Sequence, residues 1–241
     1  MATWQQELPT GVILTHTTTR AEGDFAIDGE PVALEARRRS VADHPWVWLR
    51  QVHGADVVVA TRDNAGELAG IEADAVVTVE ADLVLAIQTA DCVPVTFWCD
   101  EGVIGAAHAG WRGLEAGVVE HTIEAMWALG AGVIRARTGP CIEGACYEFG
   151  AAELGRLTAR FGDVVEVVTR DGRPGLDLLA LTDAAVIDTK PAAWPVALDL
   201  DGPCTACDAE RWYSHRARAD AGRMATVIWR ESSYERAMAT R

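Results

Sequence analysis

Short apolar runs separated by turn residues fill much of the chain, and they predict buried β-strands. The runs are rich in valine, isoleucine and tryptophan, and glycine, aspartate or asparagine divides them. β-Branched and aromatic residues favour strands, whereas the dividing residues favour turns. The predicted strands are Gly11–His16, Trp46–Val52, Asp56–Ala60, Ala75–Val79, Val84–Gln88, Val93–Trp98, Val103–Ala107, Val133–Thr138 and Ala225–Trp229.

A helical period replaces this pattern after Gly113. Apolar residues between Leu114 and Trp127 fall on one face of a helix, while the glutamates of this segment lie largely off that face. Gly130 and Gly132 provide the stop of this helix. Weaker patterns predict two further helices, Ala151–Phe161 and Leu178–Asp188.

The mixture of strands and helices predicts the α/β fold class, as a single layered α-β-α domain with a mixed sheet over residues 1–241. A chain of 241 residues builds a substantial core in one domain, so a second domain is not required. Segments rich in turn residues predict loops at Asp171–Gly175 and Lys190–Pro195.

The composition narrows the range of partners. Hydrophobic residues make up 49% of the chain and charged residues 24%, a globular balance that excludes a disordered or fibrous protein. The formal net charge of −15 repels phosphate backbones and anionic lipids, so nucleic acid and membrane surfaces are disfavoured as partners. A small anion can still bind in a locally basic pocket, because net charge governs only the long-range attraction.

The sequence predicts a cytoplasmic location. No apolar run approaches the roughly 20 residues that span a bilayer, and Met1–Pro9 lacks the basic and apolar parts of a signal peptide. In the reducing cytoplasm, metal binding or catalysis explains a special cysteine better than a disulfide does. The six cysteines are Cys92, Cys99, Cys141, Cys146, Cys204 and Cys207.

Two histidines and one cysteine stand at the ends of predicted strands. His53 precedes a glycine turn, Cys92 lies between two apolar runs, and His108 lies where a strand gives way to the long helix. Zinc prefers imidazole and thiolate ligands, and three protein ligands leave a fourth position for water or substrate. The spacing matches no local metal motif, so a buried structural cysteine and hydrogen-bonded histidines are the alternative interpretation.

Several motifs extend this picture over most of the chain. They are Arg50-Gln51-Val52-His53-Gly54, Ala73-Asp74-Ala75, Thr89-Ala90-Asp91-Cys92-Val93-Pro94-Val95, Ala107-His108-Ala109-Gly110-Trp111-Arg112-Gly113, Gly139-Pro140-Cys141-Ile142, Cys146-Tyr147-Glu148, Cys204-Thr205, Tyr213-Ser214-His215-Arg216 and Gly222-Arg223. With these ordered motifs the chain resembles the family once called multicopper polyphenol oxidase or laccase-domain proteins. The later-assigned activities of that family are on purine nucleosides.

The resemblance implies a zinc enzyme with a single α/β layered domain. It implies that His53, Cys92 and His108 bind zinc, and that small-molecule purine nucleosides and phosphate are the partners. The implied reactions are phosphorolysis of adenosine, inosine and methylthioadenosine, as by a purine nucleoside phosphorylase, and deamination of adenosine, as by an adenosine deaminase. The segment from Thr19 to Ser40 departs from the family pattern, so no substrate contact by Arg20 is carried over.

The two reactions suggest further site residues. Deamination needs a proton shuttle, for which Asp91 is the first candidate and Glu148 the second, against a turn-forming role for Asp91. Phosphorolysis needs an anion site, which Arg112 and the backbone N–H groups at the start of the long helix suit. Arg50 lies three residues before His53, where a turn is needed to bring its side chain to the site. Surface ion pairs are the alternative role for both arginines.

Two rival functions use the same residues differently. Oxidation of phenols would need copper, which is possible at a site with two histidines and a cysteine, but six histidines cannot also furnish a trinuclear copper cluster. Alternatively, Cys92 is the nucleophile and His108 the base of an amide hydrolase that edits peptidoglycan precursors. Metal analysis separates the first rival from a zinc enzyme, and thiol alkylation with and without a chelator separates the second.

Three other patterns point more weakly to function. Cys204 and Cys207 form a CxxC motif, for which a redox or structural-zinc role is possible, but a CxxC without a second pair is a weak signal. Because Cys204-Thr205 belongs to the pattern of the family that the chain resembles, a structural role is favoured. Trp111 lies inside the His108 motif and is a candidate pocket residue, whereas the other tryptophans are expected in packing. The run Arg37-Arg38-Arg39 is interpreted as a solvated helix face.

Overall fold

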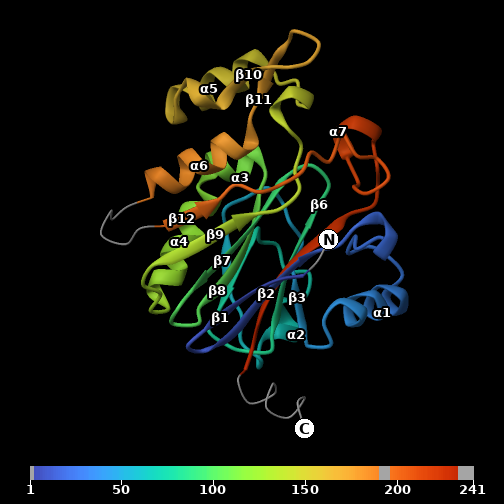
Figure 1. The fold of residues 1–241 in the computed structure, drawn as a ribbon, viewed down its shortest axis with the longest axis vertical. Helices are drawn as coiled ribbons and strands as arrows, with labels where there is room; N and C mark the ends of the chain where they lie inside the picture. The colour runs from blue at the N-terminus through green and yellow to red at the C-terminus, as the bar shows by residue number, and fades with distance from the viewer. Residues whose placement is uncertain (1–2, 190–195, 233–241) are drawn as a thin grey trace.

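The computed structural model describes residues 3–189 and 196–232, and it shows strands in the middle of the molecule with helices outside them (Figure 1). The strands are β1 Trp4–Leu8, β2 Gly11–Thr17, β3 Trp46–Trp48, β4 Val57–Val59, β5 Ala75–Thr78, β6 Val84–Thr89, β7 Val93–Cys99, β8 Ile104–Ala109, β9 Ile134–Thr138, β10 Glu166–Val168, β11 Pro174–Leu176, β12 Val196–Asp199 and β13 Met224–Glu231. The helices are α1 Pro31–Val41, α2 Ala65–Leu68, α3 Trp111–Ala116, α4 Val118–Ala128, α5 Ala151–Phe161, α6 Leu178–Asp188 and α7 His215–Arg218, with 3-10 turns η1 Arg20–Glu22, η2 Gly144–Cys146 and η3 Asp163–Val165.

The predicted mixture of strand directions is present in two large sheets. Six strands form one sheet in the order β12-β9-β7-β8-β5-β4, and five form the other in the order β1-β2-β13-β6-β3. Parallel pairs occur at both edges of the first sheet and between β3 and β6 in the second, and the other pairs are antiparallel. Strands β5 to β8 are buried along their whole length, which explains their continuous apolar runs.

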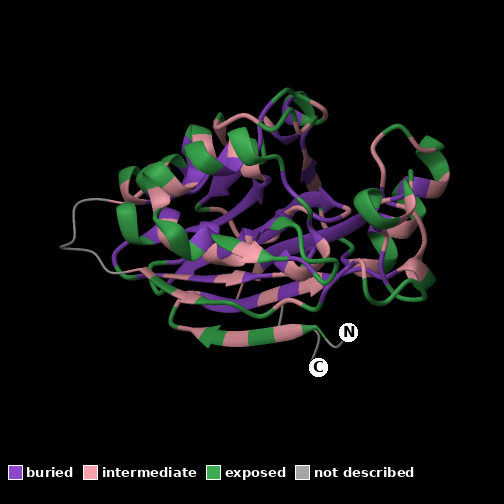
Figure 2. Ribbon diagram, turned by 90° about the horizontal axis from the view of Figure 1, so that it is seen from above, coloured by how far each residue is buried: buried purple, intermediate pink, exposed green. Residues whose placement is uncertain are grey.

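Three apolar clusters bind the layers together. Residues of α4, α5 and α6 pack on one face of the six-stranded sheet, and its other face packs on the five-stranded sheet. Helix α1 then covers the outer face of the five-stranded sheet through Leu34. Figure 2 shows the buried residues concentrated on the strands and the exposed ones on the outer sides of the helices. The α/β class is therefore confirmed, with a second sheet inserted between the helical layers.

Several element boundaries follow the sequence pattern and several do not. Helices α5 and α6 have the predicted bounds, but the long helix after Gly113 is divided at Gly117, whose φ of 96° is left-handed. The strand predicted at Trp46–Val52 ends at Trp48, after which the chain leaves the sheet. Part of the predicted loop Asp171–Gly175 is strand β11. The predicted loop Lys190–Pro195 lies outside the described residues.

The arginine run on α1 is only partly solvated, contrary to prediction. Arg38 is 7% exposed, and its guanidinium lies 4.6 Å from the centre of the Trp48 ring. The apolar stem of an arginine can cover hydrophobic surface while its planar head stacks on an aromatic face. Arg38 therefore helps to attach α1 to the strand β3 side of the molecule.

A helix needs roughly 20 mostly apolar residues to cross a lipid bilayer. Within the described ranges, every helix is too short or too polar to cross one.

Candidate active site

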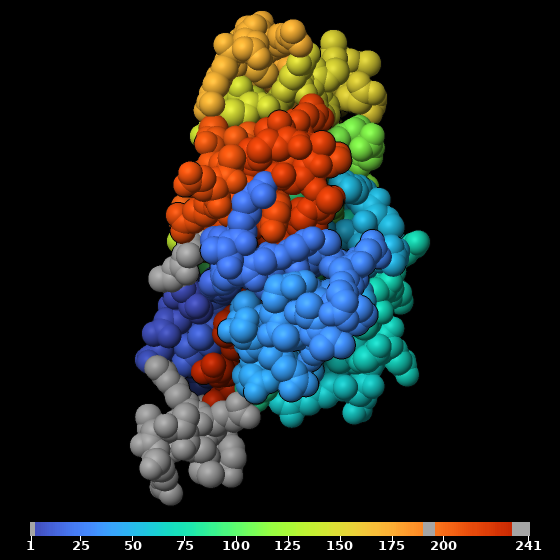
Figure 3. Space-filling view, turned by 90° about the vertical axis from the view of Figure 1, so that its right-hand side faces the viewer, coloured from blue at the N-terminus to red at the C-terminus, as the bar shows by residue number. Residues whose placement is uncertain are grey.

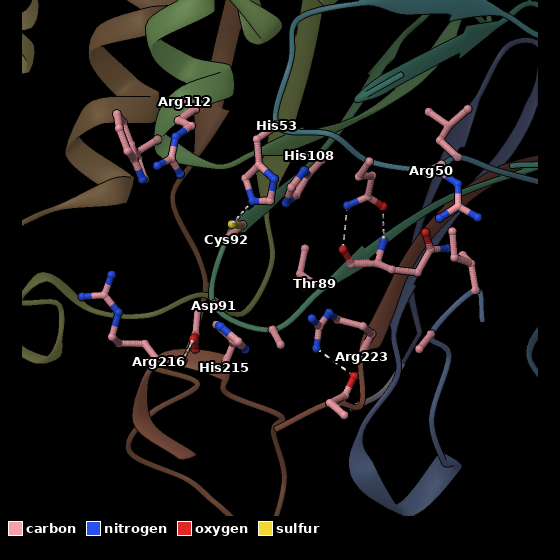
Figure 4. A pocket seen from close by; sticks show the side chains of 18 of the residues that line it. Arg50, His53, Thr89, Asp91, Cys92, His108, Arg112, His215, Arg216 and Arg223 are labelled. Atoms are coloured by element: carbon pink, nitrogen blue, oxygen red, sulfur yellow. Dashed lines mark hydrogen bonds between the residues drawn. The ribbon is translucent and has the colours of Figure 1, made fainter. Parts of the chain in front are cut away.

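Three distant segments bring His53, Cys92 and His108 together, as the sequence predicted. His53 lies in the turn after β3, Cys92 in the turn between β6 and β7, and His108 in β8. Their ligand atoms all lie within 4.8 Å of one another, and Cys92 Sγ is 3.8 Å from His53 Nε2. Figure 4 shows both imidazoles directed toward the sulfur. We call these three residues the Cys/His trio.

Asp74, a buried residue immediately before β5, positions two members of the trio. Its carboxylate accepts hydrogen bonds from the backbone N–H groups of Val52, His53 and Gly54 at 3.1, 3.0 and 2.7 Å. It also accepts one from His108 Nδ1 at 2.8 Å. This last bond leaves His108 Nε2 free to act as a ligand, which is the usual arrangement of a metal-binding histidine.

The backbone around the trio is held in uncommon conformations. His53 has a φ of 60° and Asp91 a φ of 108°, in the region that residues other than glycine seldom adopt. A Cβ atom added at Gly110 would lie 2.8 Å from His53 Cδ2 and 3.0 Å from Cys92 Sγ. Only glycine therefore allows the chain to pass so close to both side chains. Such strain is typical of functional sites.

With no metal ion bound, the trio favours the thiolate of Cys92 and the protonated ring of His108, and a metal ion would displace the proton on His108 Nε2. Burial acts to raise the pKa of the Cys92 thiol, but His108 and His53 outweigh this effect and lower that pKa to about 6. Burial acts to lower the pKa of His108, but the Cys92 thiolate and Asp74 raise it to about 9. Cys92 is thus a thiolate near neutral pH, the form that binds metals and attacks electrophiles.

The donor set of the trio fits a metal ion. Two imidazoles and one thiolate, close enough to share one cation, are ligands that zinc accepts, and a fourth position is left for another group. The hydrogen bond from His108 Nδ1 to Asp74 supports the same conclusion independently, because metal-binding histidines usually donate their other ring nitrogen to a carboxylate. The trio could therefore hold a metal ion.

A pocket of about 560 Å³ opens beside the trio. Residues 26–28 and 215–223 contribute to its lining, and Figure 3 shows the blue N-terminal and red-orange C-terminal segments in contact on this side of the molecule. Backbone hydrogen bonds join the two segments, from Arg20 to Arg211 and from Phe25 to Arg223. Besides the trio, the lining has four arginines and one histidine, and only two carboxylates, Asp28 and Asp91; the basic residues are Arg50, Arg112, Arg216, Arg223 and His215. This basic lining contrasts with the net charge of −15.

Both arginines predicted for the anion site line this pocket. The Arg112 guanidinium lies 4.2 Å from the centre of the Trp111 ring, and among the described residues no carboxylate pairs with it. Arg50 lies 3.6 Å from Asp28 at the opposite side of the pocket. The backbone N–H of Leu114, also predicted for this role, is donated to the Gly110 carbonyl at 2.9 Å and is not available to an anion.

The two predicted proton shuttles lie in different surroundings. Asp91 lines the pocket, but its two oxygens accept hydrogen bonds from the Thr205 hydroxyl and the Arg216 N–H, both at 2.6 Å. Glu148 is exposed, is paired with Arg173 at 2.8 Å, and is not among the pocket residues. Arg20 is also outside the pocket, where it pairs with Asp220.

The comparisons with known proteins agree with these observations. A family model described as multi-copper polyphenol oxidoreductase laccase matches residues 26–231. The chain belongs to this family. Among curated members similar to it, a purine nucleoside phosphorylase of Streptomyces griseus is 36% identical over 218 residues, 85% of this chain and 84% of that protein. A purine nucleoside phosphorylase of Mycobacterium tuberculosis is 34% identical over 235 residues, 89% of this chain and 91% of that protein.

A solved structure shows the same fold. YlmD from Geobacillus stearothermophilus superposes with a TM-score of 0.78 at 25% identity, over 95% of this chain and 99% of that one. The laccase-family fold is therefore shared across nearly the whole chain.

Several residues in and behind this pocket were not predicted to be functional from the sequence. Asp74, which lies behind the pocket, is part of the Ala73-Asp74-Ala75 motif, and a carboxylate flanked by buried residues signals a need for internal hydrogen bonds. Four pocket residues also lie in the sequence motifs, but no local pattern shows that their segments face the trio; they are Tyr147, His215, Arg216 and Arg223. The Arg216 guanidinium lies 4.5 Å from the centre of the Tyr147 ring, so the two form one wall.

Proposed function

We propose that the chain is a single-domain, zinc-dependent purine nucleoside phosphorylase that acts on adenosine, inosine and methylthioadenosine. The observation that carries this proposal is one pocket that contains both the Cys/His trio and four arginines, in a strongly acidic protein. A metal site and an anion site side by side suit a reaction between a nucleoside and phosphate. The names of the relatives support the same reaction class.

The reaction requires the protein to hold two substrates in line. A phosphate oxygen forms a bond to C1′ of the sugar as the bond from C1′ to the base nitrogen breaks. Adenosine and inosine then give the free base and ribose 1-phosphate, and methylthioadenosine gives adenine and 5-methylthioribose 1-phosphate. Arg112 and Arg50 are the two candidates for the phosphate site, because guanidinium groups match phosphate oxygens in shape and charge. They lie at opposite sides of the pocket, and we assign the phosphate to Arg112, since Arg50 is paired with Asp28. Trp111 and Tyr147 offer aromatic surfaces on which a purine can stack.

The trio contributes the metal to this arrangement. A zinc ion held by His53, Cys92 and His108 would supply a Lewis acid beside the substrates. Asp91 accepts hydrogen bonds from the Thr205 hydroxyl and the Arg216 backbone N–H. In phosphorolysis we therefore propose that Asp91 is a positioning residue, which holds these two segments of the pocket wall in place. Zinc rather than copper is proposed because a site with three protein ligands and an open position is typical of catalytic zinc.

Product analysis tests the proposal. The zinc-loaded chain is incubated with each of the three nucleosides, with and without inorganic phosphate, and the products are identified by mass. Free base and the sugar 1-phosphate, formed only with phosphate, are expected: ribose 1-phosphate from adenosine and inosine, and 5-methylthioribose 1-phosphate from methylthioadenosine. Inosine formed from adenosine without phosphate would instead reveal deamination, in which Asp91 is the proposed shuttle. Free ribose formed regardless of phosphate would overturn phosphorolysis. His53→Ala is the matched variant without an intact trio.

A second candidate function is a cysteine-dependent amide hydrolase. The arrangement resembles a cysteine nucleophile with an oriented base: Asp74 orients His108 through a 2.8 Å hydrogen bond, and His108 lies beside the Cys92 thiolate. Alkylation of Cys92 is measured with and without a chelator. Protection by zinc is expected if the thiolate is a ligand, and rapid alkylation of the zinc-loaded chain would favour the hydrolase.

A further inference from the structure

A second group of metal-ligating side chains lies outside the pocket. Glu143, Cys146, Cys204 and Cys207 place one ligand atom each within 4.8 Å of all the others. None of the four lines the pocket. We propose that these residues form a closed, structural zinc site, and we call them the three-cysteine cluster.

The pairing of the ligands supports this proposal. Glu143 and Cys146 are separated by two residues, as are Cys204 and Cys207. Two ligand pairs of this spacing, brought together from distant parts of the chain, are the usual construction of a structural zinc site. The CxxC motif alone was a weak signal because its second pair was missing, and the fold supplies that pair from Glu143 and Cys146.

The distances agree with a shared tetrahedral ion. Cys146 Sγ and Cys207 Sγ lie 3.6 Å apart. Two sulfurs at about 2.3 Å from one zinc, at the tetrahedral angle, lie about 3.8 Å apart. The observed separation is therefore close to that of two thiolates on one ion. Four protein ligands leave no open position, which is the pattern of a structural site rather than a catalytic one.

Neighbouring groups complete the surroundings of these ligands. The Glu143 backbone N–H points to Cys204 Sγ at 3.3 Å, and Arg170 Nη2 lies 3.1 Å from Cys207 Sγ and 3.3 Å from Glu143 Oε2. Donors around a ligand orient it and offset its negative charge. Three thiolates and a carboxylate exceed the charge of one Zn²⁺, and the Arg170 cation reduces this excess.

The chain around the cluster leads directly to the pocket. Residue 147, next to Cys146, is the pocket residue Tyr147, and Thr205, next to Cys204, binds Asp91. A zinc ion at the cluster would tie these two segments together. We therefore expect its removal to loosen the pocket wall as well as to lower the stability of the fold.

Metal counting tests the cluster. The full chain, purified with a reductant, is saturated with zinc, desalted and analysed by mass spectrometry of the metals. Two zinc ions per chain are expected in the wild type, and one each in His53→Ala and Cys207→Ser. Cys99→Ser is the control, because Cys99 lies in neither metal group, and its zinc content is expected to match the wild type. Unchanged zinc content in Cys207→Ser would overturn the proposal.

Two measurements do not depend on how Cys207→Ser folds. In the His53→Ala chain loaded with Co²⁺, strong thiolate-to-cobalt absorption is expected, and its absence would contradict the site. In the wild type, exposed Cys207 should resist alkylation when zinc is bound and react after chelation. A Cys146–Cys207 disulfide found by peptide mapping of the chain purified with reductant would replace the metal site with a redox pair. The failure of phosphorolysis in the assays above would leave these outcomes unchanged.

Discussion

At the scale of single residues, Asp74 shows how one buried carboxylate can organise a site without entering it. Four hydrogen bonds from the His53 turn and the His108 ring satisfy its two oxygens. Burial acts to raise the pKa of Asp74, but its bonds with His108 and with the backbone outweigh burial and lower the pKa. The residue is therefore an anion near neutral pH and fixes which nitrogen of His108 faces the trio.

Replacing Asp74 with asparagine should weaken metal binding. An amide cannot accept all four hydrogen bonds in the same geometry, so the His53 turn and the His108 ring lose their orientation. We expect the zinc affinity of the trio in Asp74→Asn to fall by about 10- to 100-fold. Competition with a chromogenic chelator measures this, with the exposed Asp63→Asn as control. An affinity equal to that of the wild type would show that Asp74 does not position the trio.

Gly110→Ala tests the close passage of the chain beside the trio. The added methyl group would lie 2.8 Å from His53 Cδ2 and 3.0 Å from Cys92 Sγ, which is too close for nonbonded atoms. We expect His53 to be displaced and zinc binding at the trio to weaken by about tenfold or more. Gly155→Ala is a matched control, since an added Cβ at this helical glycine meets nothing within 4 Å. Equal zinc affinity in both variants would contradict the steric explanation.

At the scale of elements, the segment around η1 and the segment around α7 are joined beside the pocket. Asp220 follows α7, and it accepts hydrogen bonds from the Ser214 backbone at 2.8 Å, from Arg218 at 3.1 Å and from Arg20. Arg20 also donates to the Trp212 carbonyl at 3.0 Å, so η1 is attached to the C-terminal segment. The family pattern could not indicate this role for Arg20, because its partners lie far along the chain.

Acid should weaken this attachment. The backbone N–H of Ser214, with Arg20 and Arg218, holds the pKa of Asp220 at about 2, below the ordinary value of 3.8. Because the pKa of Asp220 is lower in the folded state than in the unfolded state, its ionised carboxylate stabilises the fold above about pH 4. This stabilisation is lost as the pH falls toward about 2. We expect Asp220→Asn to lower the free energy of unfolding by about 1 kcal/mol at pH 7. Urea unfolding from pH 7 to pH 2 measures this, and a difference that does not shrink with acid would exclude the carboxylate as the cause.

At the scale of the whole molecule, a basic pocket sits in an acidic protein. The net charge of −15 disfavours the approach of anions, whereas the arginines at the pocket favour them locally. Such a distribution selects a small anion that can enter the pocket over a polyanion that must also meet the outer surface. This agrees with phosphate as the proposed co-substrate.

Arg112→Ala tests the phosphate site. Loss of one charge-assisted hydrogen bond should raise the KM for phosphate by about tenfold. The zinc content should stay unchanged, because within the described residues no hydrogen bond or ion pair joins Arg112 to the metal ligands. Phosphate titration of nucleoside cleavage measures this. Arg39→Ala, which removes an exposed arginine of α1, is the control. An unchanged KM for phosphate would remove Arg112 from the site.

The sequence by itself determined much of the local structure. Apolar runs gave most strands because buried strands need continuous apolar faces, and the two helices α5 and α6 have their predicted bounds. The break at Gly117 was not predicted, since a glycine inside an apolar helical period is compatible with helix until its φ is known. The choice of His53, Cys92 and His108 also came from sequence, through motifs and a family resemblance, and not from spacing.

Only the tertiary structure decided which distant segments meet. The division of the strands into two packed sheets, the reach of Asp74 to both histidine segments, and the meeting of Glu143 and Cys146 with the CxxC motif all depend on contacts far apart in sequence. Local propensity and periodicity describe a chain over a few residues, whereas a metal site or a pocket is formed by burial and packing that involve the whole fold.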